Sequence, residues 1–202
     1  MIKILYYCFT IVCFTTSLRT WAQDEDTLEP FFKFKKIKSA AYVQAGVSAD
    51  YVFKNAGAFT HLSLHWLINQ KWVASLHYAQ LSSQNNISRY TYPNSNKKIF
   101  ASHMFATFGF GYKLWNERKF SLQPNIGIGW AGLHFRNVEN KNIFRHYLTI
   151  IPEISGTWNV SKNFRLGTGF HYRIVAGKTF KDINTGTLSG PGINIFMQLG
   201  KF

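Results

Sequence analysis

Apolar and polar residues alternate with a period of two from Ala40 almost to the end of the chain. The alternation falls into segments separated by stretches that are rich in turn-forming residues. The segments span 40–52, 57–68, 71–82, 99–114, 119–135, 144–158, 163–176 and 191–202. Because successive side chains of a strand point to opposite faces, this pattern predicts an all-β protein of about eight strands.

The connections between these segments alternate between short and long. The sequences INQK, WNERK and VSKN form short connections, whereas 83–98, 136–143 and 177–190 are longer and rich in Asn, Ser, Lys and Gly. Only the first outer connection, near Lys54 to Gly57, is short where a long one is expected. A barrel with an even number of strands and both termini on the periplasmic side has this alternation. We therefore expect a closed, antiparallel, up-and-down barrel.

The aromatic residues indicate which face of the barrel is apolar. Apolar residues occupy even positions in the second to seventh segments and odd positions in the first and last. Aromatic residues on the apolar phase flank the tight turns. Other aromatic residues on this phase, which include Trp130 and Tyr172, lie at the opposite ends of the strands. Those beside the turns are Trp66, Trp72, Tyr112, Phe120, Trp158 and Phe164. Two such girdles are typical of the two interfaces of a bilayer, which predicts a transmembrane barrel with a polar lumen filled by side chains.

The start of the chain predicts export. Residues 1–22 combine Lys3, an apolar core and small residues before a cleavage point after Ala22, which is the pattern of a signal peptide. Both cysteines, Cys8 and Cys13, lie in this leader, so we expect no disulfide after cleavage. Residues 23–38 lack clean periodicity and are interpreted as a periplasmic lead-in to a barrel over 39–202.

The net charge of +14 indicates a polyanionic partner. Phosphate-rich lipopolysaccharide and anionic head groups fit this charge. Nucleic acid is not expected, because the basic residues are spread over both barrel ends and the lumen and form no single groove. The outer connections contribute many of these residues, which are interpreted as ordinary solvent-exposed loop charge, with contact to lipopolysaccharide phosphates as the alternative. They are Lys54, Arg89, Lys97, Lys98, Arg136, Lys141, Lys178 and Lys181.

Residues 40–202 resemble the small outer-membrane β-barrel family, which includes the OmpA transmembrane domain and porin-like eight-stranded proteins. The closing sequence GINIFMQLGKF contributes to the resemblance, since its final Phe202 is similar to the terminal aromatic of the family's assembly signal. Phe202 is out of phase with the apolar set from Ile193 to Leu199, which predicts a bulge near Gly200. The resemblance implies location in the outer membrane after export through the periplasm, with the barrel-assembly machinery as a partner.

Charged residues on the polar phase predict a network inside the lumen. Glu153 faces a lumen that contains Arg145, Arg165, Arg173 and His171 on the same phase. An isolated buried carboxylate is costly, so we expect Glu153 to pair with these residues. The network is interpreted as a stabilising plug, with a gate in a narrow pore as the alternative.

The histidines suggest two further kinds of chemistry. His61, His65, His77, His103 and His171 lie on the inward phase, and hairpin pairing places His61 near His77, where two imidazoles could share a metal ion. The favoured interpretation is that all five are hydrogen-bonded in a packed lumen, with no cofactor.

A hydrolytic group of Ser63, His61 and Asp50 is a second, weaker hypothesis. Our leading functional hypothesis is therefore a non-enzymatic barrel with a structural or surface-interaction role and possible envelope protein partners. A small passive pore and a lipid-modifying enzyme are the alternatives, since the barrels of the family that the chain resembles serve in all of these roles.

Overall fold

The computed structural model describes residues 38–83, 85–86, 99–116, 119–136, 142–178 and 185–202. The predicted signal peptide and nearly all of the predicted lead-in lie outside these residues and stay predictions. Within them, no helix is both long and apolar enough to cross a membrane. Eight long strands make up most of the described chain: β1 (Ser39–Val52), β2 (Asn55–Ile68), β3 (Trp72–Leu81), β5 (Phe100–Tyr112), β7 (Phe120–Arg136), β8 (Asn142–Asn159), β9 (Phe164–Ala176) and β10 (Gly190–Gly200).

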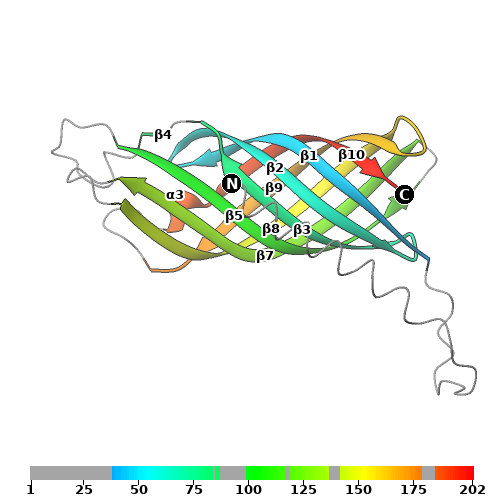
Figure 1. The fold of residues 1–202 in the computed structure, drawn as a ribbon, viewed down its shortest axis with the longest axis horizontal. Helices are drawn as coiled ribbons and strands as arrows, with labels where there is room; N and C mark the ends of the chain where they lie inside the picture. Colours follow the sequence, from blue (N-terminus) through cyan, green and yellow to red (C-terminus); the bar gives the residue numbers. More distant parts are fainter. Residues whose placement is uncertain (1–37, 84, 87–98, 117–118, 137–141, 179–184) are drawn as a thin grey trace, which may run out of the picture. The chain divides into compact units, whose positions relative to one another are not determined.

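These strands close into an antiparallel barrel in which consecutive long strands are neighbours (Figure 1). The closing pair joins β1 to β10, with Tyr42 opposite Gly200 and Asp50 opposite Gly192. The pairing of β5 with β7 completes the circle, so every long strand has two partners. Closure satisfies the backbone hydrogen bonds that an open edge would expose to lipid. The predicted fold class is confirmed.

The two ends of the barrel differ in their connections. One end, here the turn end, carries the β2–β3 turn at Asn69 and Gln70, the turn at 160–163, and both barrel termini. The other, the loop end, carries the β1–β2 turn and the longer connections. Asn69 and Gln70 have positive φ, as do Phe53 and Lys54 in the β1–β2 turn. Two consecutive positive φ values are those of the tight hairpin turns whose twist matches the flanking strands.

Three short elements were not predicted from the sequence. The two-residue strands β4 (Asn85–Asn86) and β6 (Trp115–Asn116) extend neighbouring hairpins, and α3 (Thr185–Leu188) is a single helical turn before β10. The last strand also ends at Gly200 rather than at residue 202.

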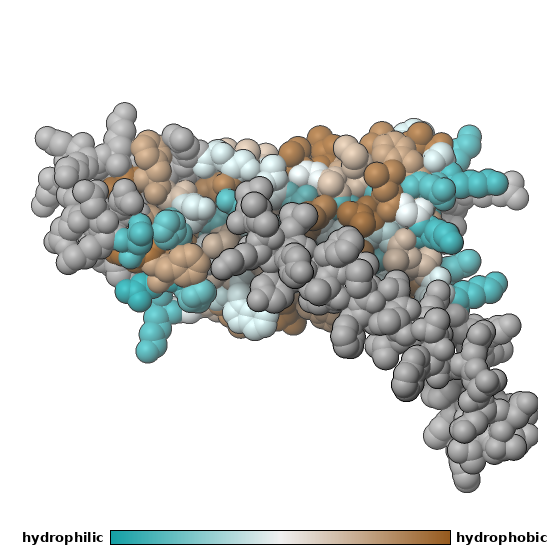
Figure 2. Space-filling view, in the orientation of Figure 1, coloured by the Kyte–Doolittle hydropathy of each residue, from teal (hydrophilic) through white to brown (hydrophobic). Residues whose placement is uncertain are grey.

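The outward face of the barrel is apolar, as the phase of the sequence predicts. Leu62, Phe108 and Ile128 are each about half exposed, whereas their sequence neighbours on the odd phase are buried. The odd phase of the first and last strands also holds, with Val47 and Ile195 exposed. Figure 2 shows apolar residues across the barrel wall and hydrophilic residues at its two ends. An apolar wall of this kind faces lipid, because exposing the same surface to water would carry a large free-energy cost.

Candidate functional site

A cluster of apolar side chains closes the lumen at the loop end. Phe59 and Phe105 pack with ring centroids 5.8 Å apart, and Leu188 from α3 is fully buried against the same cluster. The other large members of this loop-end cluster are Val52, Phe53, Leu133 and Phe135. The cluster explains why α3 lies where it does, since its apolar Leu188 fills space between the strands.

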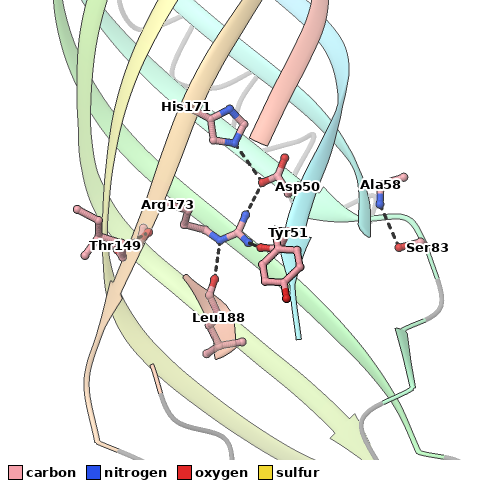
Figure 3. A network of polar contacts seen from close by, with 9 residues as sticks. Asp50, Tyr51, Ala58, Ser83, Thr149, His171, Arg173 and Leu188 are labelled. Carbon is pink, nitrogen blue, oxygen red and sulfur yellow. Dashed lines mark hydrogen bonds and ion pairs between the residues drawn. The ribbon is translucent and has the colours of Figure 1, made fainter. Parts of the chain in front are cut away.

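Beneath this cluster, Asp50 on β1 and two side chains of β9, His171 and Arg173, form a buried network (Figure 3). Arg173 Nη1 donates a hydrogen bond to Asp50 Oδ2, and His171 Nε2 donates to the same oxygen at 3.1 Å. Arg173 Nε also donates to the carbonyl oxygen of Leu188 at 2.9 Å, and Nη2 to that of Tyr51 at 3.2 Å. The side chains of Asp50 and Arg173 are completely buried. The network therefore links β1 and β9 to α3.

The acid of this network is Asp50, whereas the sequence analysis expected Glu153. Within the described residues Glu153 makes no ion pair, and its Oε1 accepts a hydrogen bond from Asn194 Nδ2 at 3.1 Å. Gly192 stands between β1 and β9, opposite Asp50 on one side and His171 on the other. A Cβ at Gly192 would lie 2.4 Å from His171 Nε2 and 2.5 Å from Asp50 Oδ1. Because Gly192 has no side chain, Asp50 reaches the side chains of β9. This glycine is the sequence feature that could have indicated Asp50 as the acid of the network.

The other two predicted members of the network lie elsewhere. Arg145 is exposed on β8, near the loop end of the barrel. Arg165 is buried at the turn end, where its Cζ lies 3.8 Å from the centre of the Phe202 ring. The structure thus brings Arg173 and His171 together with Asp50, whereas Arg145 and Arg165 lie apart from that group. Glu153 lies opposite His171 in register but accepts its hydrogen bond from Asn194.

The middle of the lumen is polar and almost full. A cavity of about 30 Å³ lies among side chains that include His61, His77, Glu153 and Asn194, which is room for a few water molecules. The ring centroids of His61 and His77 are 5.5 Å apart, so the predicted proximity of these two residues is correct. Among the described residues, no group of three or more His, Cys, Asp or Glu side chains is arranged to hold a metal ion.

The hypothetical hydrolytic group is not assembled. A hydrogen bond of 2.6 Å joins Ser63 Oγ to His77 Nδ1, and Asp50 is engaged by Arg173 and His171. His61 therefore lacks both the nucleophile and the acid that the hypothesis assigns to it. Of the other lumen histidines, His103 Nδ1 lies 3.1 Å from the carbonyl oxygen of Gly132, which satisfies one ring nitrogen.

Aromatic side chains also close the turn end of the lumen. Tyr42 stacks on His65 with centroids 4.6 Å apart, and the Phe202 ring lies 5.0 Å from Tyr42 on its other side. Gly200 ends β10 with a φ of 149°, and Lys201 N donates to the Ala41 carbonyl oxygen at 3.1 Å. Phe202 faces the lumen like the other even positions of β10, such as Phe196 and Gln198. The register of β1 with β10 is unbroken up to Gly200, so the predicted bulge near Gly200 is wrong. The role of Phe202 in assembly stays a prediction.

The predicted girdle residues point outward. Trp130 and Trp158 are the most exposed of them, at 72% and 66%. At the turn end, Phe120 lies opposite Trp158 in register, and the Trp72 and Tyr112 rings are 4.6 Å apart. Trp66, Trp72, Phe120 and Tyr172 are exposed, while Tyr112 and Phe164 are partly buried. The positions fit the amphipathic belts that aromatic side chains form at bilayer interfaces.

Comparison with known proteins places the fold. No family model and no curated protein matches the chain. Among solved structures, Neisserial surface protein A is 13% identical with a TM-score of 0.56, and covers 83% of this chain and 100% of its own. The Ail attachment invasion locus protein of Yersinia pestis, solved with the heparin analogue sucrose octasulfate, is 13% identical with a TM-score of 0.54 over 82% and 99%. A major outer membrane protein of Thermus thermophilus is 8% identical with a TM-score of 0.55 over 81% and 99%.

The fold is therefore that of the small outer-membrane β-barrels. The eight-stranded closure, the outward apolar wall and the filled polar lumen together define an integral outer-membrane barrel, as the sequence predicts. Fold alone does not define the activity of such a barrel.

Proposed function

We propose that this protein is a non-enzymatic anchor in the outer membrane, whose loop end interacts with partners at the cell surface. The observation that carries the proposal is the filling of the lumen by side chains at both ends. The loop-end cluster lies at one end of a central cavity of about 30 Å³, and the Tyr42, Leu67, Val73 and Phe202 contacts lie at the other. Because packed side chains fill the interior of the barrel, the outer loops are the surface that remains available for interaction.

The filled lumen argues against the passive pore. The expected result in planar lipid bilayers is that the purified full-length protein gives no stable current steps. The matched variant is Phe59→Ala with Phe135→Ala, which thins the loop-end cluster and should not conduct either while the turn-end contacts persist. Stable, reproducible conductance of the unmodified protein would contradict the proposal and support the pore.

The buried position of the Ser63 and His77 pair argues against a lipid-modifying enzyme. Ser63 is buried inside the barrel, so a lipid ester outside the wall has no access to its hydroxyl. We expect lipid mass spectrometry to find the same outer-membrane lipids in a deletion strain and its parent. A lipid species that changes on deletion, and is restored by the gene but not by Ser63→Ala, would contradict this.

Basic residues at the loop end support a polyanionic partner. Lys54, Arg145 and Lys178 are exposed there. Arg89, Lys97, Lys98, Lys141 and Lys181, and the side chain of Arg136, lie outside the described part of the chain. The similar Ail barrel was solved with a sulfated sugar analogue, which supports the same class of ligand here. We propose that the loop end binds the phosphate groups of lipopolysaccharide.

This binding is tested with purified lipopolysaccharide and the detergent-solubilised protein. Lys54→Gln with Lys178→Gln should weaken binding roughly thirtyfold at low salt, because each lysine near an anionic surface contributes about 1 kcal/mol. Lys119→Gln with Lys162→Gln is the matched control, since both lysines are exposed at the turn end. Binding that is insensitive to salt, or that falls equally in both variants, would overturn the proposal.

A further inference from the structure

Two cationic side chains are buried at the turn end of the lumen without an acidic partner among the described residues. Lys113, which follows β5, is only 5% exposed, and Arg165 on β9 is 7% exposed. Lys113 Nζ and Arg165 Nε have no hydrogen-bond partner within the described part of the chain. Taking an ammonium or guanidinium group out of water costs several kcal/mol unless an opposite charge compensates it.

The same region places further donors and aromatic walls beside these cations. His65 stacks on Tyr42, and neither His65 ring nitrogen has a partner among the described side chains and backbone. Tyr42 lies opposite His65 on β2 and opposite Gly200 on β10, while Arg165 lies opposite Gln198. Tyr42 and His65 therefore come from adjacent strands, while Arg165 on β9 and Lys113 after β5 come from other strands at the turn end of the barrel.

The electrostatics of this group is one-sided. Lys113 is close enough to Arg165 for the two charges to repel. Burial first, and this repulsion second, lower the pKa of Lys113 to about 7. The acid on the neighbouring strand β8, Glu153, is turned to Asn194. Donors without a balancing carboxylate are the composition of an anion-binding site.

A hollow lies next to this group at the turn end. It has a volume of about 160 Å³ and is bordered by Phe202, Leu67 and Gln70. Phe202 both lines the hollow and contacts Arg165, whose Cζ lies 3.8 Å from the centre of the ring.

We propose that Lys113 and Arg165 bind one small oxyanion of the sulfate or phosphate type at the turn end of the lumen, with His65 as a third donor. The oxyanion is either free in solution or the phosphate of a lipid head group. Bound there, it neutralises the two cations and completes the closure of the lumen.

The test is the thermal stability of the full-length protein in dodecyl maltoside at pH 6, in sodium sulfate and in sodium chloride of equal ionic strength. Sulfate should raise the Tm by on the order of 5 °C at saturation. Lys113→Met should abolish this shift, and Lys113→Arg should retain it. Lys162→Met, which removes an exposed lysine from the same end, should leave it unchanged.

The pH dependence separates binding from a purely structural role. Sulfate keeps its double charge from pH 6 to pH 9, so any change in the shift reports on the protein. The shift should shrink as the pH rises through the pKa of Lys113, because the neutral amine loses its attraction for the anion. In chloride, Lys113→Met should be at least as stable as the unmodified protein, since it removes an uncompensated charge.

A second arm distinguishes the two sources of the oxyanion. The protein is reconstituted in vesicles of phosphatidylglycerol with phosphatidylcholine, and in phosphatidylcholine alone. A shift that sulfate produces in detergent supports the free oxyanion, whereas a stabilisation that needs phosphatidylglycerol and Lys113 supports the head group. The proposal is overturned if neither condition gives a stabilisation that depends on Lys113.

Discussion

The two ends of the lumen are built from the same parts but differ in charge balance. Each has a buried arginine on β9 above an aromatic ring: Arg173 lies 5.1 Å from the Phe59 centroid, and Arg165 lies 3.8 Å from that of Phe202. At the loop end, Asp50 compensates Arg173. At the turn end, Arg165 has Lys113 rather than a carboxylate as its charged neighbour within the described residues.

This difference teaches that a buried cation serves two distinct purposes in one barrel. The compensated end is a structural plug, because each side-chain nitrogen of Arg173 donates to a group within the protein. The uncompensated end retains donors for a ligand from outside. Side chains fill the lumen at both ends, so packing alone does not distinguish the structural end from the end that retains donors for a ligand.

The largest effect is expected from removing the acid at the loop end. Asp50→Ala leaves Arg173 buried without its counter-charge, and should lower the free energy of unfolding by roughly 3–5 kcal/mol. Urea unfolding of the barrel in lipid vesicles, followed by tryptophan fluorescence, measures the change. The control is Asp50→Leu with Arg173→Met, which removes both charges and should recover most of the loss. An equal loss in single and double variants would mean that packing, and not charge balance, sets the stability of this end.

A smaller effect is expected at the turn end from removing the ring that closes it. Phe202→Ala loses the contacts with Tyr42 and Arg165, and should lower the free energy of unfolding by about 2 kcal/mol. Phe202→Tyr keeps the ring and is the matched control. The same pair of variants tests the predicted assembly signal, because a defect in insertion in cells that exceeds the loss in purified protein identifies a role in assembly.

Much of the fold follows from the sequence because it depends on a repeating local rule. The period-two phase assigns Trp130 to the lipid face and places Lys113 inside, since position 113 is on the inward phase of its segment. The phase also explains the closed barrel, because strands with one apolar face and one polar face satisfy both lipid and lumen only when they close.

The pairing inside the lumen does not follow from such a rule. Asp50 and Arg173 are 123 residues apart in sequence and meet only because β1 pairs with β10 and Gly192 leaves room between the strands. Phase alone makes Glu153 an equally good partner for Arg173. Three-dimensional register, which the alternation does not encode, decides between these possibilities.

The smallest effect is expected from the acid that the sequence singled out. Glu153→Gln keeps an oxygen that accepts the Asn194 hydrogen bond, so the free energy of unfolding should change by less than about 1 kcal/mol. Glu153→Leu removes the acceptor and should cost about 1–3 kcal/mol, because Asn194 Nδ2 is then left without it. Planar-bilayer recordings of Glu153→Gln should give no current steps. This result would argue against the alternative that Glu153 gates a pore. A loss in Glu153→Gln as large as that in Asp50→Ala would mean that the charge of Glu153 is compensated inside the lumen, and the contrast between the two acids would then fail.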